Sequence, residues 1–514
     1  MAQENTMDSV LRVAAIFSDN MVLQRDRYVP VWGSGKDGTV VSLSFGSARG
    51  VVRVRVVNGV WEARLPPHSA GERGELEIAG GGEKICFKNV VFGDVWFAGG
   101  QSNMEMELQN CKDGEEELAR ADNPGIRFYQ PVKRAFVDGD FLRAERDCCW
   151  QECRPDTAAV LSAVAYFFAR KVNAETGVPV GIINCSWGGT SVSAWMGGEQ
   201  LQKTVAGQRC LDDYEALVNG KTDEQYDAEM AAYFEEWQAW DNRIQERRAK
   251  EPDVTWEILN SECGECPWPQ PAGKKSPYRP TNLYHSMIRR VAPYGLKGFL
   301  YYQGEEDELR AKDYGYLMCS LIDQWRSDWR DDTLPFLFVQ LPMYASKKET
   351  DDGTVTENWP VLREKQYKVS RIVANTGMAV IIDKGEFDNI HPLDKQTVGF
   401  RLSLQALQKV YGKPVVADGP VFSHAVREKG ALRVYFENAE SGLEKRGELC
   451  GFEAAGQDGV FHQATAAIDG ETVLVFGAGV AEPEQVRYCW VKYGPTPLFA
   501  KNGLPVMPFR STGG

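Results

Sequence analysis

Five near-continuous apolar runs dominate the middle of the chain. They lie at 91–98, 180–185, 297–302, 335–341 and 378–383. Segments with helical spacing, such as 160–168, separate them. Runs of this kind are typical of strands in a parallel sheet that helices cover on both faces. The sequence therefore predicts an α/β domain over about residues 91–414, with a five-stranded parallel sheet between helices.

A serine follows the first of these runs in a setting that suits a nucleophile. Gly99 and Gly100 come before Ser102, and glycines tolerate the strained backbone of a tight strand-to-helix turn. Residues 105–108 are expected to form the first turn of a helix. Ser102 would then lie at a helix N-terminus, where free N–H groups favour negative charge. An ordinary N-cap serine is the alternative interpretation.

Few histidines are available as a base for such a serine. The chain has five: His68, His285, His391, His424 and His462. His391 stands apart because Asp388 lies three residues before it in an expected loop. A carboxylate there can accept the Nδ1–H bond, which leaves Nε2 as the general base. Ser102, Asp388 and His391 are therefore the leading candidates for a catalytic triad.

Four polar blocks lie at or after the carboxyl ends of the predicted strands, where open α/β sheets bind ligands. They are Gly100-Gln101-Ser102-Asn103-Met104, Trp187-Gly188-Gly189-Thr190, Tyr302-Gln303-Gly304-Glu305 and Asp388-Asn389-Ile390-His391-Pro392. In this order the blocks resemble the signature blocks of the sialate O-acetylesterase family, a branch of the SGNH hydrolases that is related to acetylxylan esterases. The resemblance extends to 17–24 and 503–510, and it implies an SGNH-hydrolase-like (flavodoxin-like) sheet.

The resemblance also implies roles for single residues. Ser102 would be the nucleophile, His391 the general base, and Asp388 the acid that orients the base. Glu305 is a second candidate for that acid. We prefer Asp388, because its closeness to His391 in sequence makes the contact easy to form.

The same resemblance implies an oxyanion hole. Its donors would be the backbone N–H groups of Ser102 and of either Gly188 or Gly189, with the side-chain amide of Gln303 as a third. The family often has Ser-Asn after Gln-Gly-Glu, where this chain has Glu306-Asp307. We expect this departure to alter the charge of the pocket and to leave the chemistry unchanged.

These residues suit ester hydrolysis through an acetyl-serine, with no metal or other cofactor. Activity is expected to rise with pH through an apparent pKa near or somewhat below about 7. The expected substrate is O-acetylated sialic acid, and acetylxylan or acetylmannan is the second candidate. The alternatives are a non-catalytic carbohydrate-binding protein on a relic hydrolase core, and a lipase or thioesterase of the same fold.

Composition excludes some partners. The net charge of −14 argues against binding to nucleic acid or to an anionic membrane surface. No apolar stretch is long enough to cross a bilayer. The resemblance implies a free or glycan-linked O-acetylated sugar as the partner, and the oligomeric state is left open by the sequence.

The N-terminal residues and the cysteines indicate the cellular compartment of the protein. Residues 1–7 lack the basic and apolar regions of a signal peptide. The protein is expected to be cytoplasmic, or exported with its signal removed from this sequence. Its twelve cysteines are expected to be reduced thiols, with metal binding or redox cycling by Cys263 and Cys266 as the less favoured alternative.

Two flanking regions and one insertion depart from the alternation of strands and helices. Short alternating strands over about 10–90 predict an N-terminal β-sandwich, and residues 415–514 predict a second β-rich module. Residues 205–275 interrupt the catalytic region. Within them, Asp223 to Lys250 is interpreted as an amphipathic helix that covers the sheet, with a lid or sugar platform as the alternative.

Overall fold

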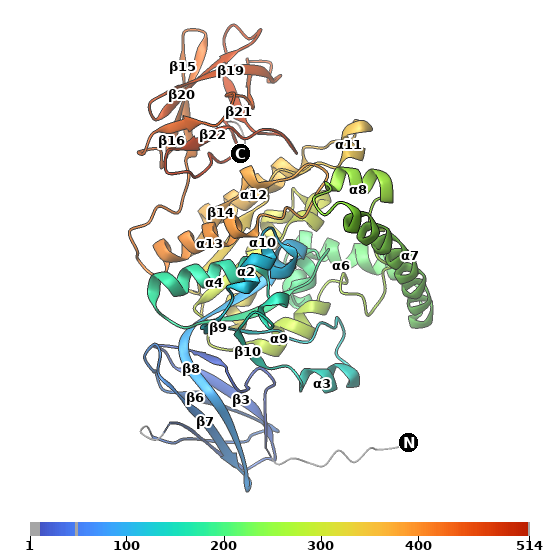
Figure 1. Ribbon diagram of the computed structural model, residues 1–514, viewed down its shortest axis with the longest axis vertical. Coiled ribbons are helices and arrows are strands. Elements are labelled where there is room, and N and C mark those ends of the chain that lie inside the picture. Colours follow the sequence, from blue (N-terminus) through green and yellow to red (C-terminus); the bar gives the residue numbers. More distant parts are fainter. Residues whose placement is uncertain (1–10, 47–49, 512–514) are drawn as a thin grey trace. The chain divides into compact units, whose positions relative to one another are not determined.

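The computed structural model describes residues 11–46 and 50–511 (Figure 1). The prediction that the chain has no signal peptide rests on residues 1–7, which lie outside the described residues. Backbone contacts divide the chain into two compact units, which are described separately. The first unit comprises 1–211, 275–301 and 320–337, and the second comprises 212–274, 302–319 and 338–514.

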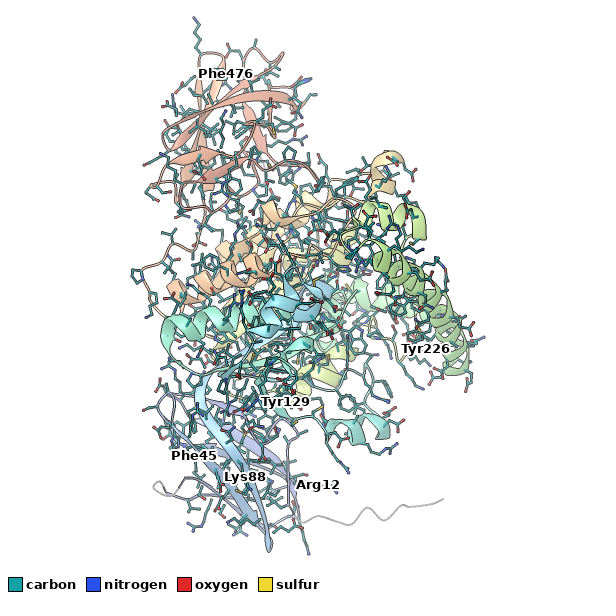
Figure 2. The ribbon with its side chains drawn as sticks, in the orientation of Figure 1. Arg12, Phe45, Lys88, Tyr129, Tyr226 and Phe476 are labelled. Carbon is teal, nitrogen blue, oxygen red and sulfur yellow. The ribbon has the colours of Figure 1, made fainter. Side chains whose placement is uncertain are left out.

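The N-terminal region of the first unit consists of strands, as the alternating pattern predicts. They are β1 (Leu11–Val13), β2 (Val22–Gln24), β3 (Val29–Gly35), β4 (Val40–Phe45), β5 (Val52–Arg55), β6 (Val60–Leu65), β7 (Arg73–Gly80) and β8 (Glu83–Gly100). One antiparallel sheet has the order β1-β3-β6, and the other has β5-β4-β7-β8 with β2 parallel to β8. Alternate side chains are buried, among them Val41, Leu43 and Ile78. Phe45 (Figure 2) packs edge-on against His68 and Phe92.

Strand β8 is 18 residues long and belongs to two regions of the fold. Its first half pairs with β7 in the N-terminal region. Its second half pairs in parallel with β11 (Val180–Ser186), in a register that runs from Asp94 to Gly100. From Val90 onward every residue of β8 is buried. The N-terminal region and the sheet that carries Ser102 therefore share one continuous strand.

The sheet of the first unit has the order β10-β9-β11-β8-β12. The strands not yet given are β9 (Asn123–Tyr129), β10 (Trp150–Cys153) and β12 (Gly298–Tyr302). Strand β9 is parallel to β11, and β10 is antiparallel to β9 at the edge. The sequence analysis missed β9 and β10, because β9 begins with Pro124 and Gly125 and β10 has only four residues.

Short helices connect these strands. Those of the first unit are α1 (Ser102–Glu105), α2 (Gly114–Ala119), α3 (Gly139–Glu145), α4 (Ala163–Thr176), α5 (Gly198–Leu201) and α9 (Arg289–Val291), with single turns η1 (Leu108–Asn110), η2 (Ala158–Val160), η3 (Val192–Trp195) and η4 (Tyr284–Ile288). Helices α6 (Val205–Val218) and α10 (Tyr314–Asp328) have residues in both units. Ser162 caps α4, whose apolar face is buried as predicted.

The last two apolar runs also form strands, β13 (Phe336–Gln340) and β14 (Thr376–Val380), which pair with each other. Strand β14 ends three residues before the predicted limit, because Ile382–Lys384 turns into the 3₁₀ helix η6. Helices of the second unit include η5 (Glu305–Arg310), α11 (Lys347–Asp351), α12 (Asn358–Ile372) and α13 (Lys395–Lys409). The fold is a mixed α/β fold with β-rich regions at both ends.

The insertion forms two helices, α7 (Asp223–Lys250) and α8 (Trp256–Cys263). A capping box between Thr222 and Gln225 fixes the start of α7 where the sequence predicts it. The buried side of α7 packs against α8 in a small core that includes Trp240, Ile244 and Leu259. Tyr226 (Figure 2) is buried near the start of α7. Trp237 and Trp240 of α7 are thus partnered by α8, and not by the sheet as we expected.

The C-terminal strands form an antiparallel sheet with the order β15-β16-β20-β19-β18-β21-β23, and β17 pairs with β22. Their bounds are β15 (Val421–Glu428), β16 (Ala431–Glu437), β17 (Leu443–Lys445), β18 (Phe452–Ala455), β19 (His462–Asp469), β20 (Thr472–Gly477), β21 (Gln485–Tyr488), β22 (Leu498–Ala500) and β23 (Phe509–Arg510). Their core also contains Met343 and Ile382, which follow β13 and β14. Phe476 (Figure 2) remains exposed on β20.

Two further findings concern the cysteines and the membrane. All twelve cysteines are free thiols. Over residues 11–46 and 50–511, one group has the spacing of metal ligands, formed by Glu75, Glu77 and Cys86, and it does not include Cys263 or Cys266. No helix in this part of the chain combines the length and the apolar character that a membrane span requires.

Candidate active site

Ser102 lies at the end of β8, as predicted. Gly100 takes a φ of +143°, a backbone conformation that side chains disfavour, and the chain then turns into α1. The helix begins at Ser102 and ends at Glu105, so it comprises one turn rather than continuing through residues 105–108. Asn103 and Met104 are fully buried, and Ser102 is half-buried. Because α1 is so short, its dipole contributes little to the charge preference at Ser102.

The Trp187–Thr190 turn follows β11, the neighbour of β8. The backbone N–H of Trp187 donates to the carbonyl of Gly100 at 3.1 Å. The Thr190 hydroxyl donates to the carbonyl of Trp187 at 2.7 Å and closes the turn. A Cβ atom added to Gly188 would lie 3.3 Å from the Cβ of Ser102. Two blocks that are more than eighty residues apart in sequence are therefore in direct contact.

Gly188 forms a hydrogen bond to the short helix α1. The N–H of Gly188 donates to the carboxylate of Glu105 at the end of α1. Glu105 also forms an ion pair with Lys133, whose ammonium lies 5.2 Å from the centre of the Trp187 ring. Burial lowers the pKa of Lys133 to about 8. The residues Glu105 and Lys133 were not identified from the sequence.

Gln303 follows β12 and belongs to the second unit, as do Glu305, Asp388 and His391. Its side-chain Nε2 donates to the Asp307 carboxylate at 2.6 Å. The Tyr314 hydroxyl donates to the Oε1 of Gln303 at 3.1 Å and to its carbonyl at 2.9 Å. These contacts fix which way the amide points.

The acidic segment after Gln303 is buried. Glu305 and Asp307 are 7% and 0% exposed. Burial, and then the charge of Asp307, raises the pKa of Glu306 to about 8. Asp307 holds the Gln303 amide, and the expectation that the Glu306-Asp307 departure leaves the chemistry unchanged stays a prediction. The departure supplies the group that orients a candidate oxyanion donor.

Asp388 is also held in place by its neighbours. Its φ is +56°, and its N–H donates to the carbonyl of Ala345 at 3.0 Å. Its carboxylate accepts from the backbone N–H of Lys347 at 2.8 Å and from the Nδ2 of Asn260 at 3.0 Å. A carboxylate has about four acceptor positions, so these two bonds leave room for a further donor. Asn260 comes from α8, which shows that the insertion supports this loop.

His391 lies in a turn that hydrogen bonds within the loop hold. Its N–H donates to the Oδ1 of Asn389 at 3.0 Å, and the Nδ2 of Asn389 donates to Glu386 at 2.7 Å. Desolvation, and then the positive charge of Lys395, lowers the pKa of His391 to about 4. The imidazole is therefore neutral at physiological pH, as a general base must be. This pKa is lower than the value near 7 that we expected from the sequence.

A buried lysine connects the C-terminal region to the segment after Gln303. Lys492 is 2% exposed. Its ammonium lies 2.9 Å and 3.0 Å from the two oxygens of Glu308 in η5, and 2.5 Å from Glu349 in α11. The aromatic rings of Tyr344 and Trp359 lie beside the same ammonium. The C-terminal region thus helps to fix η5, which carries Glu305 and Asp307.

The sequence matches an established family over more than half of its length. Residues 92–248 and 270–397 match the family described as "Carbohydrate esterase, sialic acid-specific acetylesterase". The match places the protein among the carboxylic ester hydrolases. Within that class, the chain belongs to the sialic acid-specific acetylesterase family of carbohydrate esterases.

Relatives and a solved structure agree with this assignment. The human protein named sialate O-acetylesterase is 26% identical over 97% of this chain and 92% of its own length. The mouse protein of the same name is 27% identical over 80% of this chain and 75% of its own. The crystal structure of a carbohydrate acetylesterase from Xanthomonas citri is 32% identical, with a TM-score of 0.75, and covers 98% of this chain and 99% of that one.

Proposed function

We propose that the protein is a serine-dependent carbohydrate O-acetylesterase with Ser102 as nucleophile, His391 as general base and Asp388 as the acid that orients it. The observation that carries the proposal is the contact of the Gly188–Gly189 turn with Ser102 at the end of β8. A glycine turn beside a candidate nucleophile supports the proposal, because the backbone N–H groups of such a turn can serve as the oxyanion donors that acyl transfer requires. The proposed architecture is a five-stranded parallel SGNH sheet within 91–414, flanked by the modules at 10–90 and 415–514.

In the proposed reaction Ser102 Oγ attacks the acetyl carbonyl while His391 Nε2 takes its proton. The N–H groups of Ser102 and of the glycine turn, with Gln303 Nε2, receive the oxyanion. The tetrahedral intermediate collapses, the C–O bond to the sugar breaks, and His391 returns the proton to the sugar alcohol. Water then attacks the acetyl-serine by the same route and releases acetate.

The proposed substrate is O-acetylated sialic acid, in line with the names of the mammalian relatives. Acetylxylan or acetylmannan is the second candidate, since the Xanthomonas relative is described more broadly as a carbohydrate acetylesterase. Release of acetate from 9-O-acetylated sialic acid, acetylxylan and acetylmannan, compared by kcat/KM, tests both. Activity on none of these sugars would contradict the proposal. Binding without turnover would favour a relic hydrolase that binds carbohydrate.

Asp388→Asn is expected to lower kcat by about 10⁴-fold, because an acid that orients the histidine sets its tautomer. Glu305→Gln is expected to have a smaller effect. Steady-state kinetics with p-nitrophenyl acetate measures both. Asp394→Asn is the matched control, since Asp394 caps α13 through the N–H of Thr397 at 2.9 Å in the same loop. A larger loss in Glu305→Gln than in Asp388→Asn would reassign the acid to Glu305.

The pH dependence of kcat/KM is expected to show an acidic limb well below pH 6.5, because the pKa of His391 is lowered to about 4. The imidazole becomes protonated, and inactive as a base, only below that limb. Lys395→Met removes the positive charge that disfavours protonation, so it is expected to move the limb to higher pH. Rates between pH 4 and 9 measure the limb in both proteins. A limb that moves to lower pH in Lys395→Met would contradict this assignment.

A further inference from the structure

Glu105 lies close to Ser102 and to the glycine turn. It lies three residues after Ser102 in α1, and residues so spaced share one face of a helix. Its carboxylate accepts the N–H of Gly188. A Cβ atom at position 188 would lie 3.3 Å from both the Glu105 carboxylate and the Ser102 Cβ. The glycine turn, the nucleophile and Glu105 therefore form one packed group, which holds a side chain that the proposed reaction does not use.

The hydrogen bond from Gly188 to Glu105 distinguishes Gly188 from Gly189 as a candidate oxyanion donor. An N–H that already donates to a carboxylate is not available to a developing oxyanion unless that bond breaks. The N–H of Gly189 has no acceptor within the described part of the chain. Preorganised donors are effective because they need no rearrangement during the reaction. Gly189 meets that requirement and Gly188 does not.

A carboxylate beside an oxyanion would oppose the reaction if its charge were not balanced. Lys133 supplies the balance through its ion pair with Glu105. Its ammonium also lies over the Trp187 ring, which belongs to the same turn. The turn is thus held at Gly188 by Glu105 and at Trp187 by Lys133.

We propose that Glu105 is a positioning residue that, with its charge balanced by Lys133, fixes the Gly188–Gly189 turn so that Gly189 donates to the oxyanion. This inference rests on the proposed function of Ser102. It goes beyond that function because it assigns a task to two residues outside the triad and chooses between the two glycines.

The test compares Glu105→Leu with Glu105→Gln. Leucine removes the acceptor of the Gly188 N–H, and kcat is expected to fall by about 10²-fold with little change in KM, the range found when an oxyanion donor is lost. Glutamine keeps an oxygen acceptor, so it is expected to retain kcat within about 5-fold. Glu107→Leu is the matched control, because the carboxylate of Glu107 accepts from Gln109 and Asn110 nearby and should leave kcat unchanged.

Lys133→Met provides a second test that does not alter the acceptor. It leaves the Glu105 charge unbalanced, so kcat is expected to fall about 10-fold, and the double variant Lys133→Met, Glu105→Gln should recover most of that loss. This recovery is not expected if Lys133 has a structural role alone. If Glu105→Leu does not fold, this pair of variants decides the question.

The outcomes separate the inference from the proposed function. Esterase activity that survives Ser102→Ala would contradict the proposed function. Activity that depends on Ser102 but is unchanged in Glu105→Leu overturns the inference alone. A fall in kcat that is equal in Glu105→Leu and Glu105→Gln, or no recovery in the double variant, also overturns it.

Discussion

Ser102→Ala is expected to abolish esterase activity, with a loss on the order of 10⁶-fold in kcat. The alanine leaves the oxyanion donors in place but removes the atom that forms the acetyl-enzyme. Because Ser102 is half-buried and its side chain is small, the free energy of unfolding is expected to change by less than about 1 kcal/mol. Acetate release and thermal denaturation, measured on the same preparation, check both parts.

Ser423→Ala is the matched control. Ser423 is exposed on β15, and its hydroxyl lies 3.2 Å from the Nδ1 of His424. It is therefore a serine next to a histidine, without a glycine turn beside it. Its removal is expected to leave kcat unchanged. Residual turnover in Ser102→Ala that disappears only with Ser423→Ala would move the nucleophile to the C-terminal region.

A truncated chain that begins near residue 88 is expected to be insoluble or inactive. It would cut β8 at its middle and remove the cover of Val91 and Phe92, each about 1.5–3 kcal/mol when fully buried. It would also remove Gln24 and Arg25, which donate to the buried carboxylate of Asp94 at 3.1 Å and 2.9 Å. Breaking such a buried pair typically costs about 3–5 kcal/mol. Expression in the soluble fraction and p-nitrophenyl acetate turnover measure the outcome.

Arg25→Met isolates one part of that effect. It leaves the whole chain in place, so a loss of thermal stability without loss of kcat is expected. A truncated protein that is soluble and fully active would show that the N-terminal strands are an appended module and not part of the catalytic fold.

The sequence predicted the elements whose signals are local. The five apolar runs all became strands, and α7 begins and ends where its cap and charge pattern place it. Strand β9 escaped notice because Pro124 and Gly125 lie at its start, before its pairing with β11 begins at Ile126. The partner of α7 could not be predicted, since an aromatic stripe shows that a face is buried and does not show what covers it.

Within the candidate site, the sequence identified the chemical groups and missed the residues that hold them. Gln303 and Asp388 stand in recognisable blocks, whereas Asp307 was noticed only as a departure from the family pattern. Asn260 lies 128 residues before Asp388, and nothing in its neighbourhood marks it as a partner. Glu105 is three residues from Ser102, but its bond to Gly188 spans 83 residues. Such contacts depend on tertiary packing, which no local pattern contains.

The buried lysine near the end of the chain has a consequence for biosynthesis. A ribosome makes Glu308 and Glu349 well before Lys492, the cation that both carboxylates contact. A nascent or prematurely terminated chain that lacks the last two dozen residues therefore holds two acidic groups without the cation that brings them together. Loss of this short tail, through a nonsense codon or a protease, is consequently expected to destabilise the loop that carries Glu305 and Asp307, far away in sequence.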